Sequence, residues 1–178
     1  MRTAMVAGRI GSAELKDLAA RGATLDLSFP VSSLARLAAL SPSGGEAARL
    51  TASFTFQSGS EGCPQVHLIV AGTVPLVCQR CVELLVLPVA VDVLLTMVRN
   101  DAEAAGLADP FETVLLADGD LVPEQVVEDE VLAVLPLAPK HLETAGCGRE
   151  ERANSGEMHR PLAGLADLLG RGDRQGDE

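Results

Sequence analysis

Apolar and polar residues alternate along the middle of the chain, starting near residue 48. In 49–57 the apolar positions are Leu50, Ala52, Phe54 and Phe56, with polar residues between them. Alternation with a period of two is typical of a strand that is buried on one face. The same pattern in 25–28 indicates a further strand. Apolar runs at 65–77, 82–98 and 111–116 indicate others, with an interruption near Pro88.

Helical spacing of apolar residues replaces this alternation in three other segments. The first two are 12–20, for which Ser12 is a plausible N-cap, and 32–40. The third and clearest helix lies between Asp120, which can cap it, and Pro136, which ends it. Its apolar stripe consists of Val127, Val131, Val134 and Leu135. Because strands and helices occupy separate segments, we predict an α+β fold. We expect an antiparallel β-sheet or partly curled barrel of about five to six strands, with flanking helices.

The domain organisation follows from a change of composition near residue 148. We predict a single α+β domain over 1–147, a polar linker over 148–160, and a short helix with an acidic tail over 161–178. A helix this short is not stable alone. It either packs on its own domain or folds against a partner as a linear motif. The apolar face of the tail helix carries Leu162, Leu165, Ala166 and Leu169.

The charge of the chain is uneven. Residues 1–99 carry eight Arg or Lys and seven Asp or Glu, whereas residues 100–178 carry six and eighteen, so the second half accounts for the formal charge of -11. This half should repel phosphate backbones and attract basic surfaces, although acids also serve simply to keep a protein soluble. The chain has no Trp, no Tyr and four Phe, which leaves few side chains on which bases of single-stranded nucleic acid could stack.

Neither a membrane span nor a secretion signal is evident, because no apolar run is long enough and the N-terminus lacks a continuous apolar core. Four cysteines are too few for a disulfide-stapled scaffold of this length. We therefore expect a cytoplasmic protein with reduced thiols.

The pair Cys78 and Cys81, in the stretch "LVCQRC", permits three interpretations. A redox pair is disfavoured because strand-forming residues follow it, whereas thioredoxin-type pairs begin a helix. A CxxC at a β-turn is the usual form of a zinc knuckle, and His141 and Cys147 are the best further ligands, with Cys63 spare. The third interpretation is cysteines without a metal.

The acidic run Glu128, Asp129 and Glu130 lies on the third predicted helix. Paired carboxylates can act as acid and base or bind a divalent metal, but acids beside an apolar helical stripe are usually its solvated margin. No phosphate loop, nucleophile elbow or HExxH motif is present in the sequence.

Three motifs in order resemble the YceD family of large ribosomal RNA subunit accumulation proteins. They are "LVCQRC", "DGDLVPEQVVEDEVLAVLPLAPKH" followed by a cysteine, and "RPLAGLADLLGRG". The resemblance covers about residues 48 to 170. The family's marked positions fall on Cys78, Gln79, Arg80, Cys81, Glu128, Asp129, Glu130, Pro136, Pro139, His141 and Cys147. The tail departs from the family in having Arg160 where Asn is common, and in ending in acids rather than lysines.

The resemblance implies a cytoplasmic, non-catalytic factor for the synthesis, processing or stability of large-subunit (23S) ribosomal RNA. We expect this factor to act by docking onto a ribosomal protein or a pre-ribosomal ribonucleoprotein. The resemblance does not decide whether the factor contacts RNA directly. In this hypothesis the near-neutral β half packs on an assembly partner, while the acidic half holds a basic protein or excludes RNA. The alternatives are a thiol or zinc-dependent enzyme centred on Cys78 and Cys81, and an adaptor unrelated to ribosomes. We expect no membrane contact and no small-molecule substrate.

Overall fold

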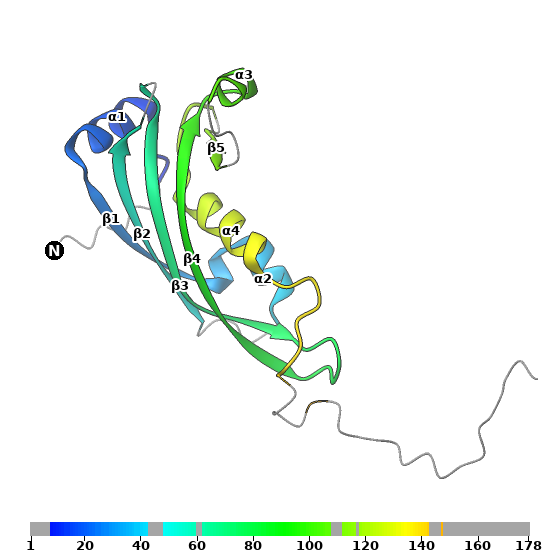
Figure 1. Cartoon of the computed structure of the whole chain (residues 1–178). Coiled ribbons are helices and arrows are strands. Elements are labelled where there is room, and N and C mark those ends of the chain that lie inside the picture. Colours follow the sequence, from blue (N-terminus) through cyan, green and yellow to red (C-terminus); the bar gives the residue numbers. More distant parts are fainter. Residues whose placement is uncertain are drawn as a thin grey trace, which may run out of the picture. The chain divides into compact units, whose positions relative to one another are not determined.

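The computed structural model (Figure 1) describes residues 8–42, 48–59, 62–107, 112–116, 118–142 and 147. Contacts divide the chain into Met1–Cys147 and Gly148–Glu178, and every described residue belongs to the first unit. The predicted linker and terminal helix, with Leu162, Leu165 and Leu169, lie outside the described residues. The domain boundaries drawn from the sequence therefore stay a prediction.

The sheet has five strands in the order β1-β2-β3-β4-β5. They are β1 (Thr24–Pro30), β2 (Arg49–Ser58), β3 (Pro64–Val77), β4 (Leu84–Val98) and β5 (Thr113–Leu115). The first four pair antiparallel, whereas β5 runs parallel to β4. The long strands bend, so that the sheet curls (Figure 1). The predicted α+β class with a partly curled sheet is confirmed, with the difference that its last pair is parallel.

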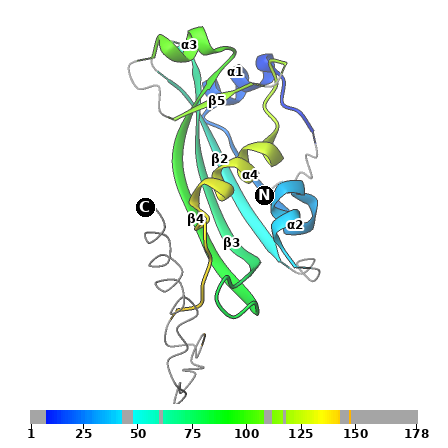
Figure 2. The same cartoon turned by 90° about the vertical axis from the view of Figure 1, so that its right-hand side faces the viewer.

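The alternation in the sequence is an alternation of burial. On β2, Leu50, Phe54 and Phe56 are fully buried, while Arg49 and Thr51 are exposed. Their apolar face is covered by helices: α1 (Ser12–Arg21) contacts β2 and β3, and α4 (Pro123–Val134) contacts β4 and α2 (Ala35–Leu40). Figure 2 shows α4 and α2 together on the concave side of the sheet. Within the described ranges, no helix combines the length and apolar character needed to span a bilayer.

Several helix details differ from the sequence-based predictions. Gly11 and Val122, rather than Ser12 and Asp120, precede α1 and α4, and neither helix has a side-chain cap. In the predicted apolar stripe, Val134 is half exposed, and it is the last residue of α4. Short helices also occur at η1 (Val31–Ser33, a 3-10 helix) and α3 (Asp101–Ala105).

Pro88 does not interrupt β4, which continues from Leu84 to Val98. The N–H of Thr96 donates to the carbonyl of Glu112 at 2.8 Å, so it points away from β3. Backbone groups alternate in direction along a strand, and Pro88 lies an even number of residues away from Thr96. The nitrogen of Pro88 therefore also points away from β3, where no ladder bond is lost.

The β3–β4 hairpin extends beyond the end of β2. The β2 register ends at Leu50 opposite Gly72, while β3 and β4 stay paired until Val77 opposite Leu84. Gly72 has φ +156, and a Cβ there would come within 2.4 Å of the Arg49 carbonyl oxygen, so a side chain would collide with β2. The hairpin end thus has no third strand beside it among the described residues. It is here that the cysteine pair lies.

Candidate metal centre

The connection between β3 and β4 is a tight turn that presents both cysteines. The N–H of Cys78 donates to the Glu83 carbonyl at 2.9 Å, and the N–H of Val82 donates to the Cys78 carbonyl at 2.9 Å. The N–H of Arg80 points at the sulfur of Cys78 at 3.4 Å. Backbone donors aimed at a cysteine sulfur favour the thiolate, which is the form that binds metals.

Val82, directly after the pair, has φ 62. This left-handed conformation suits glycine and is costly for a β-branched residue, by about 1–2 kcal/mol. Such strain persists where the surrounding structure holds the backbone in place, and it gathers at functional sites. The turn is therefore shaped to present Cys78 and Cys81 rather than to suit its own residue types.

The structure brings Cys78, Cys81, His141 and Cys147 together, with one ligand atom of each within 4.8 Å of the others. The Sγ atoms of Cys78 and Cys147 are 3.4 Å apart, as are Cys81 Sγ and His141 Nδ1. Tetrahedral zinc with sulfur at about 2.3 Å and nitrogen at about 2.0 Å would separate its ligand atoms by about 3.5–3.8 Å. The four residues fit one metal ion. The spare candidate Cys63 is not part of the cluster.

His141 is oriented for this role by its other nitrogen. Its Nε2 lies 3.0 Å from the Leu84 carbonyl oxygen, which can only accept, so Nε2 carries the proton. The lone pair of Nδ1 is then free on the side of Cys81. A backbone carbonyl that fixes the tautomer of a histidine is a common companion of metal ligation.

Further hydrogen bonds join the turn to the segment after α4. The N–H of Gln79 donates to the Pro139 carbonyl at 2.8 Å, and Nη1 of Arg80 donates to the Cys147 carbonyl at 3.3 Å. Gln79, Arg80 and Pro139 were all singled out in the sequence. In the structure their hydrogen bonds join the turn that holds Cys78 and Cys81 to the later segment that holds His141 and Cys147.

The thiols differ in their protonation. Burial disfavours the Cys78 thiolate, but the surrounding backbone N–H groups and the Cys147 thiol outweigh it and lower the pKa of Cys78 to about 5. Burial, together with the hydrogen bonds to Cys78 and Cys81, raises the pKa of Cys147 to about 11. The side chain of Cys78 lies inside the fold, since Cys78 is 0% exposed.

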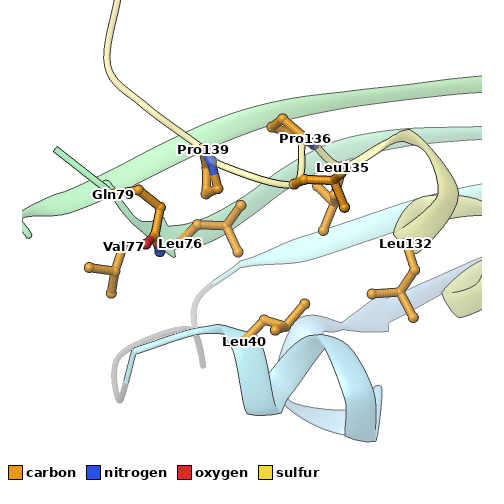
Figure 3. A pocket seen from close by; sticks show the side chains of 9 residues that line it. Leu40, Leu76, Val77, Gln79, Leu132, Leu135, Pro136 and Pro139 are labelled. Atoms are coloured by element: carbon orange, nitrogen blue, oxygen red, sulfur yellow. The ribbon is translucent and has the colours of Figure 1, made fainter.

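An apolar groove of about 310 Å³ lies beside the cluster (Figure 3). Gln79, Pro136 and Pro139 line it, so three residues marked in the sequence meet there. Figure 3 shows further walls of the groove, which are Leu40 from α2, Leu132 from α4, Leu135 directly after α4, and Leu76 and Val77 from β3. The prolines thus shape both the groove and the course of the chain towards His141.

Glu128 is buried, not part of a solvated margin as the sequence suggested. Its carboxylate accepts from the backbone N–H groups of Arg36 at 2.6 Å and Leu37 at 3.1 Å, and from Nε of Arg36 at 2.9 Å. These N–H groups belong to the first turn of α2, where no intrahelical acceptor exists. Burial opposes ionisation, but these bonds outweigh it and lower the pKa of Glu128. No pattern in the sequence indicated Arg36 as this partner, which lies ninety-two residues away from Glu128.

The neighbouring acids behave differently. Asp129 is exposed and pairs with Nη1 of Arg36 at 2.6 Å. Burial, together with repulsion by Asp129 and Glu112, raises the pKa of Glu130. Glu128 and Asp129 therefore bind α2 through Arg36, which the sequence analysis had not singled out. Their predicted part in partner binding stays a prediction.

These features define a class of protein: an α+β sheet whose protruding hairpin carries a three-cysteine, one-histidine cluster suited to a metal ion. The chain belongs to the YceD family. The model of this family, described as large ribosomal RNA subunit accumulation protein YceD, matches residues 66–169, more than half of the chain, and confirms the resemblance seen in the motifs. The match includes all four cluster residues. No curated protein and no solved structure matches the chain.

Proposed function

We propose that this protein is a non-catalytic ribosome biogenesis factor acting in the cytoplasm. It supports the synthesis, processing or stability of large-subunit (23S) ribosomal RNA by docking onto a ribosomal protein or a pre-ribosomal ribonucleoprotein. The observation that carries this proposal is the YceD family match over residues 66–169, which includes the four cluster residues and Glu128.

The surface around the cluster supports docking. Val82 and Leu84 are 76% and 58% exposed, and Leu137 and Leu142 on the adjoining segment are exposed as well. Large apolar side chains gathered at one end of a protein are typical of an interaction site. The fixed conformation of the turn would hold such a surface ready for a partner.

The cluster is proposed to hold a structural zinc ion through Cys78, Cys81, His141 and Cys147. When bound, zinc would supply binding free energy that joins the hairpin to the segment after α4. No open coordination position for a substrate is implied, because four protein ligands complete a structural site.

Deleting the gene tests the function. We expect the ratio of 23S to 16S ribosomal RNA and the large-subunit peak of a sucrose gradient to fall, and the wild-type gene to restore both. Complementation with Cys81→Ser should restore them only in part, while Cys63→Ser, a matched change outside the cluster, should restore them fully. An unchanged ribosome profile after deletion would instead support an adaptor unrelated to ribosomes.

A further inference from the structure

The outer edge of β4 is bounded by two hydrogen bonds on the side that faces away from β3. At one end, Nε2 of His141 donates to the Leu84 carbonyl at 3.0 Å. At the other, the N–H of Thr96 donates to the Glu112 carbonyl at 2.8 Å, where β5 begins its three-residue pairing. Both bonds involve even-numbered residues of β4, as the alternation of backbone groups requires.

Between these bonds, the even-numbered residues present their backbone groups to the same edge. They are Val86, Pro88, Ala90, Asp92 and Leu94. In the described part of the chain, β3 is the only strand that pairs with this stretch of β4, and it takes the bonds of the odd-numbered residues. The edge therefore offers a short ladder of N–H and carbonyl groups, with a gap at Pro88. Figure 2 shows α4 crossing the concave face rather than following this edge.

Some apolar side chains of β4 along this edge are left partly exposed on both faces of the sheet. On the concave face Leu87 and Val93 are only partly buried, whereas Val89 and Val91 lie in the core. On the opposite face Val86 and Leu94 are 55% and 37% exposed. An added strand would cover apolar side chains on both faces, and one at the top of the same edge, β5, shows that the edge accepts a strand.

We propose that the edge of β4 from Val86 to Leu94 is a docking site for an extended segment of a partner protein. The segment adds to the sheet as a further strand, with apolar side chains at alternate positions and basic residues at its ends. Main-chain bonds supply affinity in such strand addition, and the alternating side chains supply specificity. This inference rests on the proposed function, since it states how the assembly partner is held.

Charge and geometry both favour a basic partner over a second copy of this chain. Two copies, each with a formal charge of -11, repel each other, whereas a basic segment is attracted. Antiparallel self-pairing centred on Ala90 would set Pro88 opposite Asp92 twice, with a ladder bond missing each time. Centred on Asp92, it would place two carboxylates opposite each other.

Ala90→Pro separates edge pairing from folding. The N–H of Ala90 points to the free edge, so a proline there removes no bond within the chain, just as Pro88 removes none. It does remove a donor needed by an added strand and places a ring in its path. Ala90→Thr is the matched control, because it alters the exposed side chain and keeps the N–H.

The test uses the full chain and, as probe, the proteins extracted from purified large ribosomal subunits and freed of RNA. We expect the wild type and Ala90→Thr to bind the same protein, and Ala90→Pro to bind it at least about tenfold more weakly. In the bound wild type, amide exchange at Ala90, Asp92 and Leu94 should slow by about tenfold or more. This second measurement needs no variant.

Binding that is equal in all three proteins and leaves these amides unprotected would overturn the edge proposal while the proposed function stands. Loss of a homodimer as the effect of Ala90→Pro would overturn it too, because the occupant would be a second copy. If the wild type binds no large-subunit protein, or binds only ribosomal RNA added separately, the edge proposal fails together with docking onto a ribosomal protein.

Discussion

The body of the sheet and the end of the β3–β4 hairpin are stabilised in opposite ways. In the body, Phe54 and Phe56 are 0% exposed and their rings stack with centroids 6.4 Å apart. At the hairpin end only two strands pair among the described residues, Val82 and Leu84 are exposed, and the buried side chains include Leu76, Leu85 and the thiol of Cys78. A two-stranded hairpin is marginal in water. At this end, four side chains suited to share a metal ion lie beside a small number of buried apolar residues.

The largest expected effect on stability comes from a substitution in the body of the sheet. Phe54→Ala should lower the free energy of unfolding by about 3–5 kcal/mol, because it empties the middle of the core. Denaturant titration followed by circular dichroism measures this. Metal content per folded chain should stay at the wild-type value, and a parallel loss of metal would mean that the two regions are one cooperative unit.

Loss of a cluster ligand should affect the end of the β3–β4 hairpin and leave the body of the sheet unchanged. Cys81→Ser, or removal of the metal by a chelator, should speed amide exchange in 78–84 and 135–142 by about a hundredfold, while exchange in β2 stays slow. Cys63→Ser provides the control, since Cys63 lies outside the cluster. Equal exchange with and without the chelator would show that hydrogen bonds alone hold the hairpin end.

Glu128→Gln tests the contact that attaches α2 to α4. This substitution should lower the free energy of unfolding by about 2 kcal/mol, because hydrogen bonds to a buried carboxylate are stronger than those to an amide. Asp129→Asn, on the exposed neighbour, should cost less than about 1 kcal/mol. Urea unfolding at neutral pH measures the change in unfolding free energy for both variants. A larger decrease for Asp129→Asn than for Glu128→Gln would contradict the conclusion that Glu128 makes the stronger contact with α2.

The same contact predicts a dependence on pH. Since the folded state lowers the pKa of Glu128, its contribution is complete above the ordinary carboxyl pKa of 4.5 and is lost as the pH falls through the lower folded value. Wild type and Glu128→Gln should therefore converge in stability as the solution is acidified from pH 5. Curves that remain parallel over this range would argue against an ionised Glu128 in the folded state.

The smallest expected effect is an increase in the stability of the hairpin end. Val82→Gly should stabilise the hairpin end by about 1 kcal/mol, because glycine adopts the left-handed conformation at little cost. Slower amide exchange in 78–84 at an unchanged metal content is the expected readout. No gain would mean that packing of the valine side chain offsets its backbone strain.

The sequence predicted the parts of the fold that local pattern controls. Alternation in 49–57 revealed which face of β2 is buried, and the CxxC spacing pointed to a ligand pair at a hairpin end. It did not reveal that Pro88 is tolerated, because this depends on which edge of β4 stays unpaired. Nor could it show the burial of Glu128, since the donors lie on α2, far away in the chain. The orientation of the His141 ring likewise depends on the Leu84 carbonyl, a contact made only in the folded protein.

The cluster also sets an order of events during translation. Cys78 and Cys81 lie on one side of β4 and α4, and His141 and Cys147 on the other. During translation, Cys78 and Cys81 therefore emerge from the ribosome before His141 and Cys147. The delay is about 3–12 s at ordinary elongation rates. We expect the hairpin end to be the last part of this unit to become ordered, after the body of the sheet has left the exit tunnel.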